Sequence, residues 1–282
     1  LQEDVVTALR VWVDGAASDC VPVCDRGLAY GDGVFETMRC RRGLIPLLER
    51  HLDRVCSGAR RLGIVLDAEA LRDEVERFAT QASAIDCVIK LIVTRGDGTG
   101  GYRSEPATPA RRILLERPLA AYPSTWWSEG ITVRHCEMRL GSNPVLAGIK
   151  HLNRLEQVFA RREWDDPQVA EGLMADQRGR IVEGISSNLF LVSGARLLTP
   201  FIETCGVAGV MRAHLLETVA PALGIVTAEV HCERALLAGA QEVFVCNAVI
   251  GVWPVHCLGR KRWSPGPVTR RVQDHVARLF TT

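Results

Sequence analysis

The chain has 282 residues, of which 47% are hydrophobic and 24% charged, with a formal net charge of +1. A chain of this length forms one large or two medium domains with a substantial core. The near balance of 34 basic and 33 acidic residues gives no support to binding of nucleic acid or of an anionic membrane. No apolar run approaches the roughly 18 residues of a membrane-spanning helix.

The N-terminal sequence LQEDVVTALR lacks a basic segment followed by an apolar run, so we expect no secretory signal in it. The ten cysteines are scattered singly, mostly within apolar runs, where a free cysteine behaves as a small buried hydrophobe. Neither the cysteines nor the seven histidines show the spacing of metal ligands. We therefore expect reduced thiols, a cytoplasmic location and no bound metal.

The first part of the chain alternates strands and helices. Gly63 is a good terminator for one predicted helix, and Asp67 is the predicted N-cap of the next. The predicted elements are a strand at 5–15, a hairpin at 34–48 that turns at Gly43, helices at 48–63 and 67–82, and strands at 86–96 and 111–117.

Residues 117–128 contain two prolines and no clear periodicity, which predicts a linker. Trp126 and Trp127, at its end, are expected to pack between domains rather than to form a stacking platform. The elements predicted beyond it are strands at 131–136, 171–176, 181–184, 188–200, 227–232 and 242–255, and helices at 153–164, 209–224 and 267–280.

This pattern predicts an α+β protein with mixed sheets and flanking helices. We expect a smaller N-terminal α/β domain at 1–116 and a larger C-terminal domain at 129–282. No internal repeat or low-complexity tract is present.

Residues 96–101, GDGTGG, match the Gly-x-Gly-x-x-Gly pattern of dinucleotide-binding sites. Such a site needs a helix that begins at the third glycine and an acidic residue about 20 positions later. Here the chain continues as YRSEPATPA, and RPLAAYP offers no suitable acid. We therefore expect a flexible surface loop or a substrate lid, and no Rossmann site.

Only three of the 34 basic residues are lysines: Lys90, Lys150 and Lys261. A lysine amine, unlike a guanidinium, can lose its proton and attack a carbonyl. Lys150 stands in the apolar surroundings of LAGIKHL, which lower the pKa of an amine. The alternative explanation is that codon bias favours arginine over lysine and that the lysine at position 150 remains by chance.

A nucleophilic lysine serves either a carbonyl substrate or pyridoxal phosphate. The cofactor also needs a carboxylate at its pyridine nitrogen and a phosphate site of amides at a helix start, with an arginine nearby. Glu183, in IVEGISSNLF, and the amides of Val210 and Met211, in TCGVAGVMRAHL, are candidates for these roles. The candidate cationic partners of the phosphate are Arg54, Arg39 and Arg26.

The sequence resembles the class IV (fold type IV) pyridoxal-phosphate enzymes, which include branched-chain and D-amino acid aminotransferases and 4-amino-4-deoxychorismate lyases. Six ordered blocks carry the resemblance, and the lysine block GIKHLNRLEQVFAR together with CNAVIGVWPV favours the lyases. The blocks lie at residues 25–39, 47–54, 148–161, 183–190, 206–212 and 243–255.

The resemblance implies a covalent bond between Lys150 and the cofactor, with Glu183 at the pyridine nitrogen. It also implies a homodimer whose partner chain completes the site. The residues it assigns to the phosphate are Arg54, Val210, Met211 and Asn247, those lining the pocket are Ser187 and Asn188, and those on the substrate side are Tyr30 and Thr37.

For a lyase, the resemblance implies that Lys150 removes a proton from the amine-bearing ring carbon. The ether-linked pyruvyl group then leaves, and the ring becomes aromatic as 4-aminobenzoate. Thr37 or Lys150 is the candidate acid. The lyases usually carry an arginine where this chain has Gly100, so Arg95 and Arg103 are the candidates for binding substrate carboxylates.

Two alternatives stay open at this point. One is an aminotransferase of the same fold that acts on branched-chain or D-amino acids, and the other is a non-catalytic binding protein. The remaining histidines, including His51 on a helix face and His151 beside Lys150, are given no catalytic role.

Overall fold

The computed structural model describes residues 10–105 and 108–281, and the chain divides into two compact units. The first unit runs to Ala120 and also includes Ile149–Asn153. The second comprises Ala121–Gly148 and the chain from Arg154 onward. The change of unit after Ala120 falls inside the range expected for the linker, but the segment that carries Lys150 returns to the first unit.

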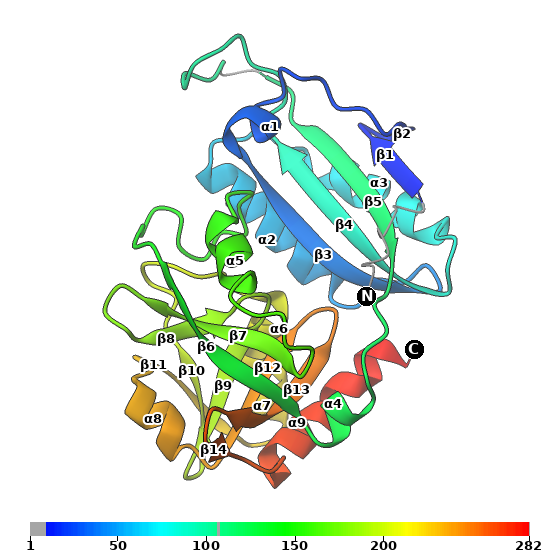
Figure 1. Ribbon diagram of the computed structural model, residues 1–282. Coiled ribbons are helices and arrows are strands. Elements are labelled where there is room, and N and C mark those ends of the chain that lie inside the picture. Colours follow the sequence, from blue (N-terminus) through cyan, green and yellow to red (C-terminus); the bar gives the residue numbers. More distant parts are fainter. Residues whose placement is uncertain (1–9, 106–107, 282) are drawn as a thin grey trace. The chain divides into compact units, whose positions relative to one another are not determined.

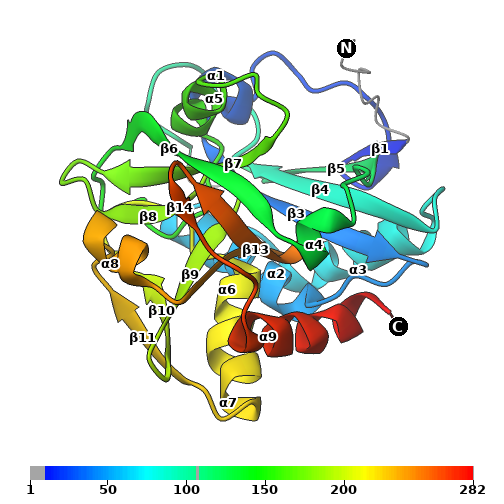
Figure 2. The same ribbon diagram turned by 60° about the horizontal axis from the view of Figure 1, so that its bottom comes forward.

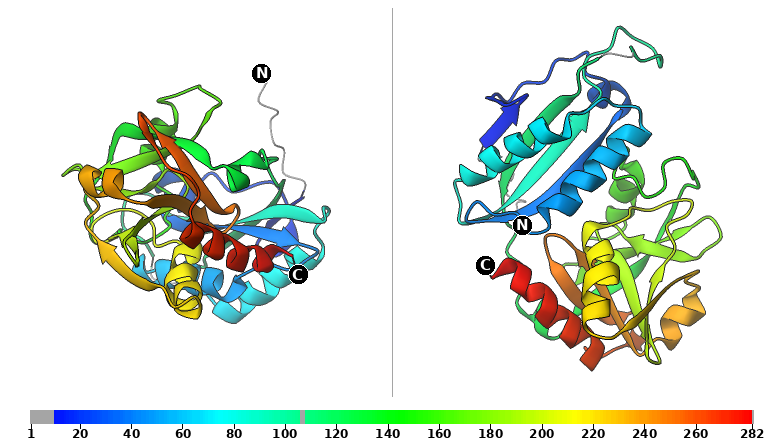
Figure 3. Two further views of the ribbon diagram at one scale, coloured as in Figure 1. Left: turned by 90° about the horizontal axis from the view of Figure 1, so that it is seen from below. Right: turned by 180° about the vertical axis from the view of Figure 1, so that it is seen from behind.

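The first unit contains an antiparallel five-stranded sheet in the order β2-β1-β5-β4-β3. Helices α2 and α3 cover one face of this sheet (Figure 1) and lie in front of the strands in the right-hand view of Figure 3. Its elements are β1 (Arg10–Val13), β2 (Ala16–Ala17), α1 (Arg26–Tyr30), β3 (Gly33–Arg41), α2 (Leu48–Arg61), α3 (Ala68–Thr80), β4 (Asp86–Thr94) and β5 (Arg111–Pro118).

Alternation along β3 and β4 gives this sheet two different faces. Every second residue is buried, and the buried set packs with α2 and α3 in one hydrophobic core. The other set points away from these helices; we call this side the outer face. Because opposed residues share a face, the outer face carries Phe35, Thr37 and Arg39 from β3, Val88, Lys90 and Ile92 from β4, and Leu115 and Arg117 from β5.

The local signals in this unit are largely confirmed. Gly63 follows α2 with a left-handed φ of 69°, and the Asp67 side chain accepts hydrogen bonds from two amides at the start of α3. The expected strand at 5–15 is confirmed over β1, and residues 5–9 lie outside the described residues. The predicted helix-free loop at 96–101 is also confirmed.

The predicted hairpin at 34–48 is wrong in its second half. Leu44 makes a single bridge with Arg41, and α2 begins at Leu48. Pro46 cannot donate a backbone hydrogen bond to a ladder, and this edge of β3 pairs with the distant segment Ile149–Asn153 instead.

The second unit contains a nine-stranded sheet, with β11-β10-β9-β12-β13-β6-β7-β8 as its main path. The pairing of β8 with β9 closes six of these strands into a ring. The strands are β6 (Ile131–Leu140), β7 (Val169–Asp176), β8 (Ile181–Gly184), β9 (Asn188–Ser193), β10 (Arg196–Pro200), β11 (Val226–Val230), β12 (Glu242–Asn247), β13 (Gly251–Leu258) and β14 (Lys261–Arg262).

Helices α6 and α9 pack on β12, and α9 also packs on β13 (Figure 2). The helical elements of this unit are α4 (Thr125–Ser128), α5 (Leu155–Arg161), α6 (Val210–His214), a π-helical turn (Leu215–Val219), α7 (Ala220–Ala222), α8 (Arg234–Gly239), α9 (Pro267–Ala277) and a final 3-10 turn (Arg278–Phe280). None of the helices within the described ranges is long and apolar enough to cross a membrane.

Four expectations for this unit need correction. The strands expected at 188–200 and 242–255 are each two antiparallel strands, β9 with β10 and β12 with β13, because the chain reverses at Gly194 and just before Gly251, two glycines with a left-handed φ. The helix predicted at 209–224 is interrupted by the π-helical turn, which lies just before Pro221; a proline cannot donate the helical hydrogen bond and crowds the preceding turn. Trp126 and Trp127 pack within the second unit, with ring centroids 4.8 and 5.5 Å from that of Trp253. All ten cysteines are free thiols.

Candidate active site

Lys150 lies on a short segment, Ile149–Asn153, that pairs with the edge strand β3. The backbone amide of Phe35 donates a hydrogen bond to the Lys150 carbonyl at 2.9 Å. Directly opposed residues in an antiparallel pairing share a face, so the Lys150 side chain points to the outer face. Ile149 points the other way and joins the core beside α2.

On the outer face two lysine amines lie near one aromatic ring. The Nζ atom of Lys150 is 4.4 Å from the centroid of the Phe35 ring, and that of Lys90 is 5.1 Å from the same centroid. Thr37 is directly opposed to Lys90 in the β3–β4 pairing. Burial lowers the pKa of the Lys90 amine, and the positive charge of Arg117 lowers it further.

Arg54 belongs to α2 and pairs with Glu36 on the helix-covered face. Its Nε and Nη2 atoms donate to the two Glu36 carboxylate oxygens at 2.6 and 2.5 Å. His51 Nδ1 lies 2.7 Å from the same carboxylate, and Glu36 is fully buried. Burial alone would raise the pKa of Glu36, but the charges and hydrogen bonds of Arg54 and His51 outweigh it and bring the pKa to about 2.

In the second unit, Glu183 and Asn188 oppose each other where β8 meets β9. The Val207 amide donates to the Glu183 carboxylate at 2.8 Å, and Asn188 Nδ2 donates to the Val207 carbonyl at 3.0 Å. Both side chains are buried. One peptide segment is therefore held from both sides by the two residues at the point of ring closure.

The chain then passes through Gly209 into α6, whose start has no side-chain cap. A Cβ atom at Gly209 would lie 1.9 Å from Asn188 Oδ1, so any other residue would displace the Asn188 side chain. Val210 and Met211 are the first residues of the helix, and the first amides of a helix have no intrahelical partner. Such a start favours an anion such as phosphate.

Ser187 is held by Glu171, a residue that the sequence did not single out. The Ser187 hydroxyl donates to the Glu171 carboxylate at 2.9 Å and the Ser186 hydroxyl at 2.8 Å, and the amides of Ile185 and Gly172 donate to it as well. Burial raises the pKa of Glu171, although these hydrogen bonds oppose the rise. Glu171 thus fixes the turn between Glu183 and Asn188.

Asn247 joins that turn to the next one. Its Nδ2 donates to the Ser186 carbonyl at 3.0 Å, while its Oδ1 accepts from the amides of Val249 and Ile250 at 2.9 Å each. The side chain therefore makes structural hydrogen bonds in this geometry.

Tyr30 ends α1 and is partly exposed, beside the glycine-rich loop. Its ring centroid is 5.5 Å from that of Tyr102, and the Arg26 guanidinium lies 4.9 Å from the Tyr30 ring. Arg26 donates to the carbonyls of Gly101, Tyr102 and Arg103 at 3.0–3.3 Å. Arg26 therefore clamps this loop.

Arg95 is occupied by internal contacts, whereas Arg103 is exposed. Arg95 pairs with Asp32 at 2.7 Å and donates to the carbonyls of Leu62 and Gly63 at the end of α2. Gly100 has a φ of 114°, which L-residues rarely adopt. The backbone thus gives a reason for glycine where the lyases usually carry arginine.

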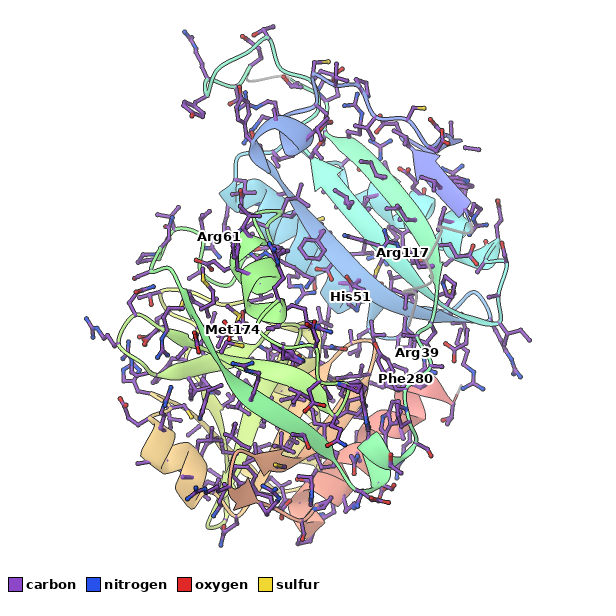
Figure 4. The ribbon with its side chains drawn as sticks, viewed as in Figure 1. Arg39, His51, Arg61, Arg117, Met174 and Phe280 are labelled. Atoms are coloured by element: carbon purple, nitrogen blue, oxygen red, sulfur yellow. The ribbon has the colours of Figure 1, made fainter. Side chains whose placement is uncertain are left out.

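The structure groups the predicted residues by unit. In the first unit Lys150 and Thr37 share the outer face, whereas Arg54 pairs on the helix-covered face. Arg39, labelled in Figure 4, pairs with Asp86 at 2.9 Å. The second unit gathers the others around the β8–β9 turn and the start of α6: Glu183, Ser187, Asn188, Val210, Met211 and Asn247.

Three partners of the predicted residues were not predicted from the sequence: Lys90, Glu36 and Glu171. Lys90 carried one signal, since it is among only three lysines. Glu36 and Glu171 carried none that stands out in sequence, because each acts through contacts with residues distant along the chain.

Comparison with known proteins shows the family of the chain. Residues 33–258 match the family described as amino-transferase class IV. An aminodeoxychorismate lyase of Vibrio harveyi is 31% identical over 272 residues, covering 94% of this chain and 98% of the relative.

Two solved structures show the same fold. The crystal structure of 4-amino-4-deoxychorismate lyase from Pseudomonas aeruginosa superposes with a TM-score of 0.92 and 50% identity, covering 95% of this chain and 98% of that one. A branched-chain amino acid aminotransferase of Escherichia coli gives a TM-score of 0.86 at 25% identity, covering 98% and 95%. The α+β, fold-type IV architecture expected from the sequence is confirmed.

Proposed function

The chain belongs to the class IV aminotransferase family, and we propose that within this family it is a 4-amino-4-deoxychorismate lyase that depends on pyridoxal phosphate. The reaction eliminates pyruvate and yields 4-aminobenzoate, a precursor of folate. The likeness to the Pseudomonas aeruginosa lyase, at 50% identity against 25% for the Escherichia coli aminotransferase, supports the lyase over the aminotransferase.

The observation that carries the proposal is the direction of Lys150. Backbone pairing with Phe35 turns its amine to the outer face of the first sheet, on which Thr37 also lies. A hydrogen-bonded strand segment directs the amine to one face of the sheet, which favours covalent attachment to a cofactor on that face.

The residues of the chain fit pyridoxal phosphate. Lys150 supplies the amine that bonds the cofactor, and the buried Glu183 carboxylate, held by the Val207 amide, suits a protonated pyridine nitrogen. The uncapped start of α6 suits the phosphate. We assign the phosphate to the amides of Val210 and Met211 and the lining of the pocket to Ser187 and Asn188. The resemblance adds Arg54 and Asn247 to the phosphate site; in this structure they donate to Glu36 and to the Ser186 carbonyl.

Pyridoxal phosphate, when bound, supplies an electron sink that stabilises negative charge on the amine-bearing carbon. Lys150 removes the proton from that carbon as a general base. Thr37, on the same face of the sheet, is our candidate to donate a proton to the departing enolpyruvate, and Lys150 itself is the alternative. Formation of the aromatic ring makes the elimination effectively irreversible.

On the substrate side we propose direct contacts from Tyr30 and from the exposed Arg103. Arg95 donates to Asp32 and to two backbone carbonyls, so we assign it a supporting part. Asp32 also accepts from Arg26 at 2.9 Å, and Arg26 holds the loop that carries Arg103. Arg95 would thereby act on the substrate through that loop.

We further propose that the protein works as a cytoplasmic homodimer. This proposal comes from the family resemblance and from the scattered free cysteines. Light scattering on the purified protein measures the mass directly: a 31.0 kDa species would contradict the dimer.

A coupled assay tests the activity. Purified protein would be mixed with pyridoxal phosphate, chorismate, glutamine and an aminodeoxychorismate synthase, and 4-aminobenzoate and pyruvate would be followed. We expect both products in equal amounts, and a loss of at least about a hundredfold in Lys150→Ala. Bound cofactor with neither product would contradict the lyase.

The aminotransferase alternative has its own readout in the same preparation. Transfer of the amino group from a branched-chain or D-amino acid to a 2-oxo acid, in the absence of lyase activity, would support it. A protein that fails to bind pyridoxal phosphate at all would instead be the non-catalytic binding protein.

A further inference from the structure

Two of the three lysines of the chain approach the same phenyl ring. The amines of Lys150 and Lys90 lie 4.4 and 5.1 Å from the centroid of Phe35, so they can be no farther apart than the sum of these two distances. They reach this ring from different strands, because Lys90 lies on β4 and Lys150 on the segment paired with β3. Lys261, the third lysine, lies in the second unit beside Trp263.

Lys90 has no acidic partner among the residues that the structure describes; the Phe35 ring is its contact there. The charged neighbour that influences it is Arg117, which is also positive, and the pKa of Lys90 is lowered by burial and then by Arg117. A half-buried cation without a counter-charge costs free energy. Such costs are characteristic of positions where a ligand supplies the opposite charge.

Two other arginines of this unit are already compensated, and Arg117 is exposed to solvent. Arg39 pairs with both Asp86 carboxylate oxygens, at 2.9 and 2.5 Å. Arg95, predicted to bind the substrate, is paired with Asp32. Lys90 therefore stands out as an uncompensated charge next to the ring that Lys150 approaches.

We propose that Lys90 binds a carboxylate of the substrate and thereby selects a cyclic dicarboxylate over an ordinary amino acid. This inference rests on the proposed function and deepens it. The substrate amine must come to the Lys150 end of the pair, and a six-membered ring places a carboxylate on the far side from that amine. The Phe35 ring between the two lysines offers an apolar surface for that six-membered ring.

The position of Lys90 would also distinguish between two classes of substrate. An amino acid substrate carries its carboxylate on the same carbon as its amine, so its carboxylate would stay near Lys150. A substrate with a carboxylate across the ring would reach Lys90 as well. Lys90 would then account for recognition of the dicarboxylate despite Gly100.

The test uses the holoenzyme and chorismate, which carries two carboxylates and lacks the amine. Isothermal titration calorimetry would compare the wild type with Lys90→Met and Lys90→Arg, and with Lys261→Met as the matched control for loss of a lysine. We expect Lys90→Met to bind chorismate about ten- to a hundredfold more weakly. Lys90→Arg should recover part of the affinity, and Lys261→Met should match the wild type.

Equal affinity of Lys90→Met and the wild type for chorismate, with the cofactor spectrum unchanged, would overturn the inference. A merely structural role would be revealed by altered cofactor binding in Lys90→Met and by no recovery in Lys90→Arg, and would overturn it too. The proposed function is judged separately, from 4-aminobenzoate formation by the wild type. An inactive wild type whose chorismate affinity still depends on Lys90 would refute the lyase and leave the carboxylate site standing.

Discussion

The charged side chains on the two faces of the first-unit sheet differ in their partners. On the helix-covered face, buried carboxylates have several partners each: Glu36 is held by His51 and Arg54, and Glu116 by the amides of Ser83 and Ala84. On the outer face, Arg39 is paired with Asp86, but Lys90 has no acidic partner among the described residues. Compensated charge on one face stabilises the fold, whereas uncompensated charge on the other is available for a ligand.

The largest effect should come from breaking the covered face. Glu36→Gln removes the charge that compensates Arg54 and His51, and loss of one partner from a buried pair costs about 3–5 kcal/mol. Urea unfolding would measure the loss. Glu49→Gln is the matched control, because Glu49 pairs with Arg72 at the exposed surface and should leave the free energy of unfolding unchanged. A free energy of unfolding in Glu36→Gln equal to that of the wild type would contradict the distinction between the faces.

The same carboxylate predicts a pH dependence of stability. The folded-state pKa of Glu36, about 2, lies below the ordinary value of 4.5, so ionisation of Glu36 favours the folded state. This contribution is fully present above about pH 4.5 and is lost as the pH falls toward 2. The stability gap between the wild type and Glu36→Gln should therefore narrow in that window. A gap of constant size across it would show that the charge of Glu36 does not account for the difference.

On the outer face, Thr37→Val should impair catalysis without loss of stability. Removal of a hydroxyl that donates a proton typically costs about a hundredfold or more in kcat, while a β-branched residue of similar shape keeps the strand intact. Thr37→Ser, which retains the hydroxyl, should keep most of the activity. The coupled assay and thermal unfolding report the two quantities. Equal kcat in Thr37→Val would leave Lys150 as the acid.

The smallest effect, and the one of opposite sign, is expected for Lys90→Met. The folded-state pKa of Lys90 lies below that of an ordinary lysine, so its positive charge disfavours folding at neutral pH. Lys90→Met should raise the melting temperature at pH 7. The gain should shrink as the pH rises through the folded-state pKa, since the amine is then neutral without mutation. Lys261→Met should show no gain in melting temperature at pH 7 or at the higher pH.

Much of the fold could be predicted because its signals are local. Asp67 caps α3, Gly63 ends α2, and the strict alternation along β3 and β4 separates two faces before any partner is known. The predictions that failed concern elements whose structure depends on which segments compete for the same strand edge. Residues 44–48 form no second strand because Pro46 cannot donate to a ladder, and the distant segment Ile149–Asn153 pairs with that edge of β3 instead.

The candidate site was predictable in part. Lys150 stands out as a rare lysine in an apolar stretch, but the face to which its side chain points depends on pairing with β3. Lys90 lies 60 positions earlier, and nothing local connects it to Phe35. The Glu36–Arg54 pair likewise joins a strand to a helix, and such pairs become evident only when the register and packing are known.

The ring of six strands in the second unit is completed by one residue pair, Glu183 with Asn188. This junction has fewer hydrogen bonds than the long ladders elsewhere in the ring, so local opening should begin there. A molecule that contacts both residues would stabilise the closed ring, so the ring would open more readily once that molecule has been released. Backbone amide protons around Val207 should then exchange with solvent deuterium faster in the protein stripped of cofactor than in the loaded protein.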